Sequence, residues 1–374
     1  MIVKICLLFG TENAYNLRQE LFWEPKMSYF RENIENTPGY TPGFQPAGAD
    51  VVKLNTNENP YPASPKVLEA IRNVSSEQLR RYPKPLGDDF RLAAAEMLGV
   101  SADNIICTKG GDELLSICFR AFCDDNRPVA YPVPTYSLYP VLAQLQNCRR
   151  VEVDFGGEFS LPAELADTNA ALTIVCNPNA PTGTFIKPED LRELAKKLNG
   201  KSILLIDEAY VDFAEGDCVG LACDFDNVII LRSMSKGYSL AGLRFGYGIA
   251  CRQLIDGLRK VKDSYNVDAV SVAAATAAIK DRDYFRKNVE KVKADRQILT
   301  VELKRLGFTV TESKANFLLA QLEGAGGIYR KLAEQNIYIR YFDQPHLSDK
   351  LRITVGTKVE NEKLIGTLKK IISM

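Results

Sequence analysis

Short apolar runs alternate with segments of helical periodicity between about residues 100 and 250, and this alternation restricts the fold more than any other feature. The expected strands are residues 104–107, 129–131, 150–153, 171–176, 203–206, 228–231 and 244–250, and the expected helices are residues 112–122, 136–145 and 187–198. Strands that are apolar throughout are typical of a parallel sheet that is covered by helices on both faces. The pattern therefore predicts an α/β fold with a mainly parallel central sheet.

The chain changes character after about residue 280. A long, charged helix is expected at residues 281–306, followed by strands at 317–322, 337–341 and 351–355 and a closing helix at 360–372. This order is typical of a smaller α+β domain. We expect four parts: an N-terminal extension (1–26), an N-terminal arm rich in proline and glycine (27–65), a large domain (66–280) and a small C-terminal domain (281–374).

Composition excludes several classes of protein. The chain has 374 residues, with 47 basic and 47 acidic side chains, so it lacks the positive charge of a general nucleic-acid or membrane-surface binder. No apolar run approaches the length of a membrane span. The nine cysteines have no C-x-x-C spacing and only His346 accompanies them, which argues against a disulfide framework and a zinc site. We expect a cytoplasmic protein without a metal, nucleic-acid or membrane partner.

The segment Ser233-Met234-Ser235-Lys236 directly follows the apolar run at 228–231, and Arg244 comes eight residues after the lysine. A lysine amine can form a Schiff base with an aldehyde, and serines with an arginine can hold a phosphate. Pyridoxal 5'-phosphate carries both groups. The alternative for this segment alone is a solvated turn after an edge strand.

Further unusual loops follow other expected strands, and in α/β sheets ligands bind at the carboxyl ends of the strands. At residues 109–113, two glycines open a helix whose exposed amides suit a phosphate, although a simple turn with acidic capping residues is the commoner meaning. Tyr136 leads a helix and is able to stack on a flat ring; its alternative is an ordinary core or surface tyrosine. Two prolines and two asparagines give residues 177–183 a fixed path.

Asp207 stands at the end of the apolar strand at 203–206. A buried carboxylate there is costly unless it meets a cation, and a protonated pyridine nitrogen is such a cation. The alternative is a helix N-cap. Taken alone, each of these loops is a weak signal.

Taken together, these motifs resemble those of fold-type I aminotransferases. The segments Asn55-Thr56-Asn57-Glu58-Asn59-Pro60-Tyr61 and Leu351-Arg352-Ile353-Thr354-Val355-Gly356-Thr357 are similar, more narrowly, to the histidinol-phosphate aminotransferase family. The resemblance extends from about Tyr40 to the C-terminus. It departs at Ala180, where the family usually has an asparagine before Pro-Thr-Gly.

The resemblance implies a pyridoxal-phosphate site. Lys236 would bind the cofactor covalently, Asp207 would pair with the pyridine nitrogen, and Tyr210 would hydrogen-bond the phenolic oxygen as the third catalytic residue. Tyr136 would stack on the ring. Asn179 or Asn177 would replace the asparagine missing at Ala180, or water would fill the gap. The phosphate would be held by Gly111, Asp112, Ser233, Ser235 and Arg244.

The resemblance also implies a substrate site and a partner. Arg352 and Arg340 would bind the substrate anion, with Tyr40 beside them, and Tyr61 would reach the cofactor of a second subunit in a homodimer. The implied reaction is transamination of L-histidinol phosphate with 2-oxoglutarate, in histidine biosynthesis. The alternatives are an aminotransferase for aromatic or branched amino acids, a lyase of the threonine-phosphate decarboxylase type, and a regulatory pyridoxal-phosphate binder; the last lacks support because no helix-turn-helix segment precedes the arm.

Overall fold

The computed structural model describes residues 29–48 and 50–373, and the chain divides into two compact units. The first ends at Pro38 and includes the short helix α2 (Glu32–Glu35); the second is Gly39–Met374. The predicted extension at residues 1–26 lies outside the described residues. The predicted division into arm, large domain and small domain at 65/66 and 280/281 stays a prediction.

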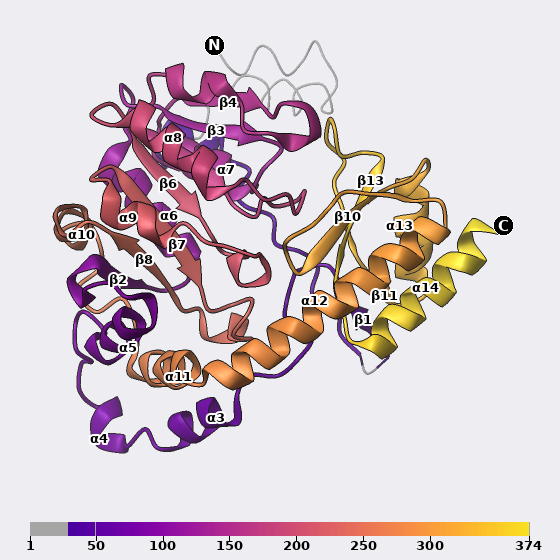
Figure 1. Ribbon diagram of the computed structural model, residues 1–374, viewed down its shortest axis with the longest axis horizontal. Helices are drawn as coiled ribbons and strands as arrows, with labels where there is room; N and C mark the ends of the chain where they lie inside the picture. Colours follow the sequence, from indigo (N-terminus) through magenta and orange to yellow (C-terminus); the bar gives the residue numbers. More distant parts are fainter. Residues whose placement is uncertain (1–28, 49, 374) are drawn as a thin grey trace, which may run out of the picture. The chain divides into compact units, whose positions relative to one another are not determined.

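A seven-stranded sheet forms the centre of the second unit (Figure 1). Its strands, in spatial order, are β2 (Ile105–Thr108), β8 (Gly246–Ala250), β7 (Val228–Ser233), β6 (Ile203–Asp207), β5 (Leu172–Cys176), β3 (Val129–Val133) and β4 (Arg150–Asp154). Every strand except β8 runs in the same direction, and β8 is antiparallel to both of its neighbours. The prediction of a mainly parallel sheet is therefore confirmed.

Helices cover both faces of this sheet, which explains why its inner strands are mainly apolar. Leu204 and Ile206 of β6 pack into a core shared with α5 (Asp88–Leu98), α8 (Pro188–Leu198) and α11 (Ala269–Lys280). Leu205, which points the other way, packs with α6 (Gly111–Phe122) and α7 (Leu138–Leu145). Because successive residues of a strand face opposite sides, both sets must be apolar.

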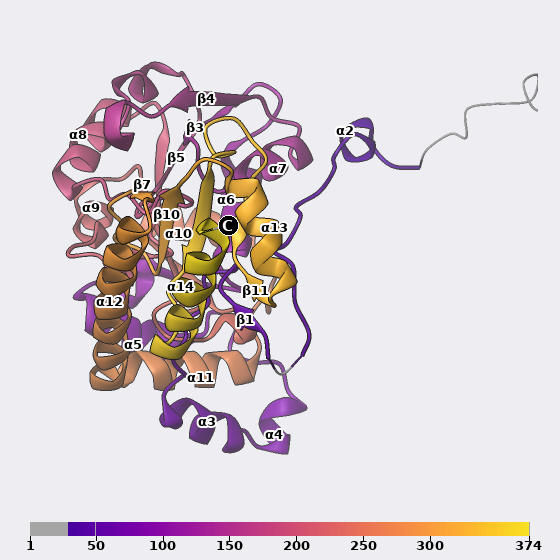
Figure 2. The same ribbon diagram turned by 90° about the vertical axis from the view of Figure 1, so that its right-hand side faces the viewer.

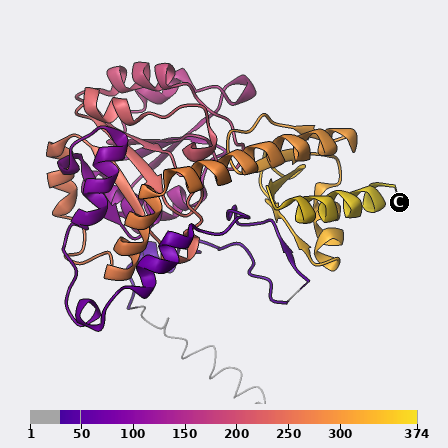
Figure 3. The same cartoon turned by 60° about the horizontal axis from the view of Figure 1, so that its bottom comes forward.

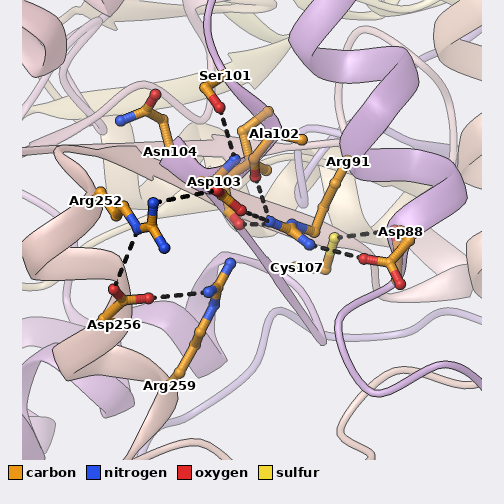
Figure 4. Close-up of polar contacts among 12 residues, drawn as sticks. Asp88, Arg91, Ser101, Ala102, Asp103, Asn104, Cys107, Arg252, Asp256 and Arg259 are labelled. Atoms are coloured by element: carbon orange, nitrogen blue, oxygen red, sulfur yellow. Dashed lines mark hydrogen bonds and ion pairs between the residues drawn. The ribbon is translucent and has the colours of Figure 1, made fainter.

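The region before residue 100 contains α3 (Pro65–Arg72) and α4 (Ser76–Leu79) as well as α5. Arg91 of α5 is buried and fixes this helix to the start of β2 (Figure 4). Its guanidinium donates to the Asp88 carboxylate (2.7 Å), to the Ala102 carbonyl (2.5 Å) and to the Ile105 carbonyl (3.1 Å). These bonds set the position of β2, whose far end leads into the glycine loop at 109–113.

A four-stranded antiparallel sheet lies in the C-terminal part, in the order β12 (Arg340–Tyr341), β13 (Lys350–Thr354), β10 (Phe317–Gln321) and β9 (Thr309–Val310). Helices α13 (Ala325–Glu334) and α14 (Lys358–Ile372) pack with it. The long helix α12 (Arg282–Arg305) runs from α11 to this sheet (Figures 2 and 3).

The prediction of a single strand at residues 337–341 is wrong. The chain changes partners at the buried Ile339: β11 (Ile337–Tyr338) pairs in parallel with β1 (Val52–Lys53), whereas β12 joins the four-stranded sheet. The predicted arm is consequently more than an extended segment, since β1 attaches it to the C-terminal part. This attachment brings residues 55–59 toward the ends of the central strands.

Across residues 29–48 and 50–373, no helix combines the length and apolar character needed to cross a membrane. The same residues contain no group of three His, Cys, Asp or Glu side chains arranged to hold a metal ion.

Candidate active site

A cavity of about 340 Å³ opens where the carboxyl ends of the parallel strands meet. Most of the residues predicted for the site line it: Tyr40, Gly111, Asp112, Tyr136, Asp207, Tyr210, Ser233, Ser235, Lys236, Arg244 and Arg352. They come from loops after β2, β3, β6 and β7, from the arm and from β13. Tyr61, Asn179 and Arg340 do not line this cavity.

Lys236 lies in the loop after β7, with its amine directed into the cavity. Its Nζ donates to the Thr56 carbonyl (3.3 Å) and lies 5.5 Å from the centre of the Tyr210 ring. Burial, with the positive charge of Arg352 acting in the same direction, lowers the pKa of Lys236 to about 8. A larger fraction of the amine is therefore neutral near pH 7 than in a free lysine, and the neutral form is the nucleophile.

Asp207 ends β6 at the floor of the cavity. Its carboxylate accepts from the Tyr139 hydroxyl (2.8 Å) and from the Ala209 amide (3.1 Å), so it caps a short turn rather than an α-helix. Burial raises the pKa of Asp207 to about 6, while these two hydrogen bonds oppose the rise. Within the described residues it forms no ion pair. A buried carboxylate without a cation suits a ligand that brings one.

Tyr139 was not among the residues that the sequence predicted. It lies in the first turn of α7, three residues after Tyr136, and the two rings meet edge to face with centroids 5.6 Å apart. A second tyrosine at helical spacing from Tyr136 was the signal available in the sequence. Its partner could not be read from that spacing, because Asp207 is 68 residues away.

A corner of the cavity is formed by Arg244, two serine hydroxyls and Asp112. Arg244 Nη2 lies 3.1 Å from the Asp112 carboxylate, and its Nη1 donates to the Ser235 hydroxyl (3.3 Å). The Ser233 hydroxyl accepts from the Ser235 amide (3.2 Å). Gly110 has φ +80°, and a side chain there would come within 2.9 Å of Arg244. The N-terminus of α6 and the Arg244 guanidinium thus lie close together, and both are groups that bind phosphate in proteins.

Two tyrosines that line the cavity have defined partners. The Tyr136 hydroxyl donates to Asp112 (3.2 Å), and its ring meets Tyr40 with centroids 6.1 Å apart. The Tyr210 hydroxyl accepts from the Asn57 amide (3.0 Å). Asn57 was not predicted, and it enters the site because β1 holds the arm in place.

The asparagines of the loop after β5 point away from the cavity. The Asn179 amide nitrogen donates to the Pro134 carbonyl (3.0 Å) and to Thr182 (2.9 Å), and its oxygen accepts from Thr135 (2.9 Å). Asn177 is bonded through both amide atoms to Ile186. Ala180 is the residue of this loop that lines the cavity. The cofactor role predicted for Asn179 stays a prediction.

Arg340 and Arg352 lie directly opposite each other on the paired strands β12 and β13. Both guanidinium groups lie over the Phe342 ring, at 5.3 and 5.5 Å from its centre. Arg352 donates to the Asn55 carbonyl (2.7 Å), while its Nε is buried without a partner among the described residues. Burial lowers the pKa of Arg352. Like charges directly opposite each other are destabilising, so an anion bound between these cations would stabilise the pair.

Tyr61 contacts its own chain on the other side of the arm. Its hydroxyl donates to Asp295 of α12 (2.6 Å), and Lys291 lies 4.8 Å from the ring centre. The structure therefore does not bring Tyr61 into the cavity formed by the other predicted residues.

The arrangement fits pyridoxal 5'-phosphate. The cofactor requires an amine for its aldehyde, an anion for its ring nitrogen and donors for its phosphate. Lys236, Asp207 and the corner at Arg244 supply these groups around one cavity. The buried, uncompensated carboxylate of Asp207 is the observation that best matches a cationic ring.

The chain is similar to known aminotransferases over most of its length. Residues 49–368 match the family model for aminotransferase class I and II. The histidinol-phosphate aminotransferase 1 of Trichormus variabilis is 50% identical over 349 residues, covering 92% of this chain and 99% of that one. The histidinol-phosphate aminotransferase of Citrifermentans bemidjiense is 41% identical over 348 residues, covering 92% and 99%.

A solved structure is similar over nearly the same length. The histidinol-phosphate aminotransferase of Sinorhizobium meliloti, in complex with pyridoxal-5'-phosphate, has a TM-score of 0.83 and 25% identity and covers 93% of this chain and 99% of that chain. Fold, site and relatives converge, and the chain belongs to the histidinol-phosphate aminotransferase family of pyridoxal-phosphate-dependent class I and II aminotransferases.

Proposed function

We propose that the protein transfers the amino group of L-histidinol phosphate to 2-oxoglutarate, as a step of histidine biosynthesis in the cytoplasm. The names of the relatives at 50% and 41% identity support the amino donor. The observation that carries the proposal is the pair Arg340 and Arg352, two cations opposite each other beside the lysine cavity. An amino donor with a phosphate, and an acceptor with a second carboxylate, both carry the anion that such a pair requires.

The residues of the cavity divide the work of transamination. When bound, pyridoxal phosphate supplies an aldehyde that takes up the substrate nitrogen and a ring that withdraws electrons from the substrate Cα. Lys236 would take the proton from Cα as a general base and deliver it, as a general acid, to the C4' carbon of the cofactor. Asp207 holds a proton at the ring nitrogen, and Tyr210 donates to the phenolic oxygen. Arg244, with Ser235 beside it, binds the cofactor phosphate.

One anion site must serve both halves of the reaction. Arginine suits this requirement, because its planar fork binds either a phosphate or a carboxylate through two parallel hydrogen bonds. Arg352 lines the main cavity, and both arginines line a smaller cavity of about 50 Å³ together with Tyr40. Among the described residues, neither guanidinium group forms an ion pair with a carboxylate.

Removing each arginine should affect the two half-reactions differently. Arg352→Gln should slow both, because donor and acceptor use this residue in turn. Arg340→Gln should slow the half-reaction with histidinol phosphate more than the half-reaction with glutamate. A phosphate dianion gains more binding energy from a second cation than a carboxylate does. Single-turnover rates with histidinol phosphate, glutamate and phenylalanine would measure this, with the exposed Arg286→Gln as control.

Two results would reject parts of this assignment. A wild-type preference for phenylalanine over histidinol phosphate would exclude the proposed donor and leave an aminotransferase of another specificity. Release of carbon dioxide in place of a keto product would favour the lyase alternative.

The protein is proposed to act as a homodimer in which Tyr61 serves the partner's site. Tyr61 does not line the cavity of its own chain. The surface also carries an exposed aromatic pair, Tyr82 and Tyr265, whose rings stack with centroids 4.5 Å apart, and the exposed Leu79 belongs to the same segment as Tyr82. Exposed aromatic clusters of this kind are typical of subunit interfaces.

Mixing two inactive variants should restore activity if the sites are shared. A mixed dimer of Tyr61→Ala and Lys236→Ala would carry one site with both residues intact and one with neither. Activity should therefore reappear when the chains exchange, and turnover per mixed dimer would measure it. Mixing Lys236→Ala with Asp207→Asn is the control. Both residues of a site come from the same chain, so every site of this mixed dimer lacks one of them and activity should not reappear. Continued inactivity of the first mixture, with exchange demonstrated by mass, would contradict the shared site.

A further inference from the structure

The peptide that follows Lys236 is bound by a side chain of the arm. The Asn59 amide nitrogen donates to the Lys236 carbonyl (3.0 Å) and to the Gly237 carbonyl (3.2 Å). Its amide oxygen accepts from the Tyr61 amide (3.0 Å), which orients the group. A single side chain, 177 residues earlier in the sequence, thus determines where the lysine backbone lies.

The same peptide is bound from a second side by Asp212. Gly237 donates its backbone N–H to the Asp212 carboxylate. A Cβ at position 237 would lie 2.3 Å from the Asp212 Oδ2 and 2.7 Å from its Cγ, so the carboxylate occupies the space that a side chain would need. The glycine after the lysine is therefore required by this contact.

The lysine side chain is held by the same stretch of the arm. Lys236 Nζ donates to the Thr56 carbonyl, three residues before Asn59. Residues 56–59 consequently contact the lysine at both ends, at its backbone carbonyl and at its amine. A lysine side chain has several rotatable bonds, so a fixed backbone alone or a fixed amine alone would leave the other free to move.

We propose that Asn59 and Asp212 are positioning residues that hold the Lys236–Gly237 peptide and so aim the Lys236 amine at the atoms between which it moves a proton. The inference rests on the proposed function of Lys236. Proton transfer is sensitive to such aim, because a misplacement of about 1 Å can cost about 100-fold in rate. Neither residue touches the reacting atoms, since both act through the backbone of the lysine.

The test compares Asn59→Ala with Asn227→Ala. Asn227 is a matched control, because its amide nitrogen also donates to two carbonyls, those of Ala195 (3.2 Å) and Ser202 (3.1 Å), in a buried part of the large sheet. Both variants lose the same side-chain amide, but only the amide of Asn59 contacts the Lys236–Gly237 peptide. The measurements are kcat and KM with any amino donor that the wild type accepts, and the rate at which cofactor-free protein attaches added pyridoxal phosphate at each pH.

The expected result for Asn59→Ala is a fall in kcat of about 10- to 100-fold with KM little changed. The pH profile of cofactor attachment should also move. Attachment needs the neutral amine, so the wild-type rate should rise with pH through about 8 and then level off. An amine freed from its buried position should titrate closer to the ordinary lysine value of 10.5, which shifts the midpoint upward. Asn227→Ala should leave the midpoint unchanged.

Two further variants keep the test informative if Asn59→Ala folds poorly. Asn59→Asp retains the shape but presents an oxygen to the two carbonyls, so it should be at least as damaging as alanine. Asp212→Asn keeps an acceptor oxygen for Gly237 and should retain most of the activity that Asp212→Ala loses. Asn59 variants that match Asn227→Ala in both kcat and attachment midpoint would overturn the proposal. The attachment profile needs no substrate, so it decides the point even if histidinol phosphate is not the donor.

Discussion

Replacing Lys236 with alanine should abolish turnover and prevent covalent attachment of the cofactor, without loss of the fold. The loss should reach at least about 10⁴-fold, the upper range for a general acid–base group, because the same residue is also proposed to bind the cofactor. The fold should persist because the amine makes one long hydrogen bond, to the Thr56 carbonyl at 3.3 Å. Removing a buried amine also removes the cost of its burial.

Borohydride reduction provides the measurement. The wild type should absorb visible light after reconstitution, and reduction followed by peptide mapping should locate the cofactor on Lys236. Lys314→Ala, which removes a surface amine paired with Glu215 (2.9 Å), is the control and should behave as the wild type does. A label on any lysine other than Lys236 would show that the attachment site is misassigned.

Asp207→Asn should lower kcat by about 10²- to 10³-fold, which corresponds to about 2.7–4 kcal/mol for one preorganised electrostatic contact. An amide has nearly the same shape as a carboxylate but carries no charge, so it cannot keep the ring nitrogen protonated. Stability should not fall, because burial already raises the pKa of Asp207 to about 6 and a neutral amide avoids that cost. Steady-state kinetics of the reconstituted variant would measure the loss.

The hydrogen bond from Tyr139 allows a graded comparison. Tyr139→Phe removes one donor to the same carboxylate and leaves its charge, so its effect on kcat should have the same direction and be smaller. Equal activity of Asp207→Asn and the wild type, at full cofactor occupancy, would mean that the charge of Asp207 plays no part in the reaction.

The central sheet could be predicted because its strands are buried on both faces. Such strands are mainly apolar, so the chain reads as apolar runs, and the polar residues that end these runs line the cavity. Asp207 and Lys236 were found in this way. The strand at 337–341 was not, because apolar periodicity does not reveal that the chain leaves one sheet for another at Ile339.

The residues that support the site were harder to predict than those that form it. Asn57 and Asn59 act on Tyr210 and Lys236, at sequence separations of 153 and 177 residues. Their local sequence is that of a polar turn, and distant contacts place them: the pairing of β1 with β11 and the hydrogen bonds of Asn57 with Thr354 and Asn316. Tyr139 meets Asp207 through a similarly distant contact. Local patterns identify functional side chains at strand ends, whereas their supports depend on the assembled fold.

The reversed strand β8 has a consequence for the distance between Lys236 and Arg244. Because β8 is antiparallel to β7, with Ser233 opposite Gly246, the chain returns to the same edge of the sheet without a crossover helix. Lys236 and Arg244 therefore belong to one short connection between paired strands. The separation between Lys236 and Arg244, which we propose as the anchors for the cofactor's aldehyde and phosphate, is then a property of a single hairpin, and it remains the same when other loops around the cavity change in length.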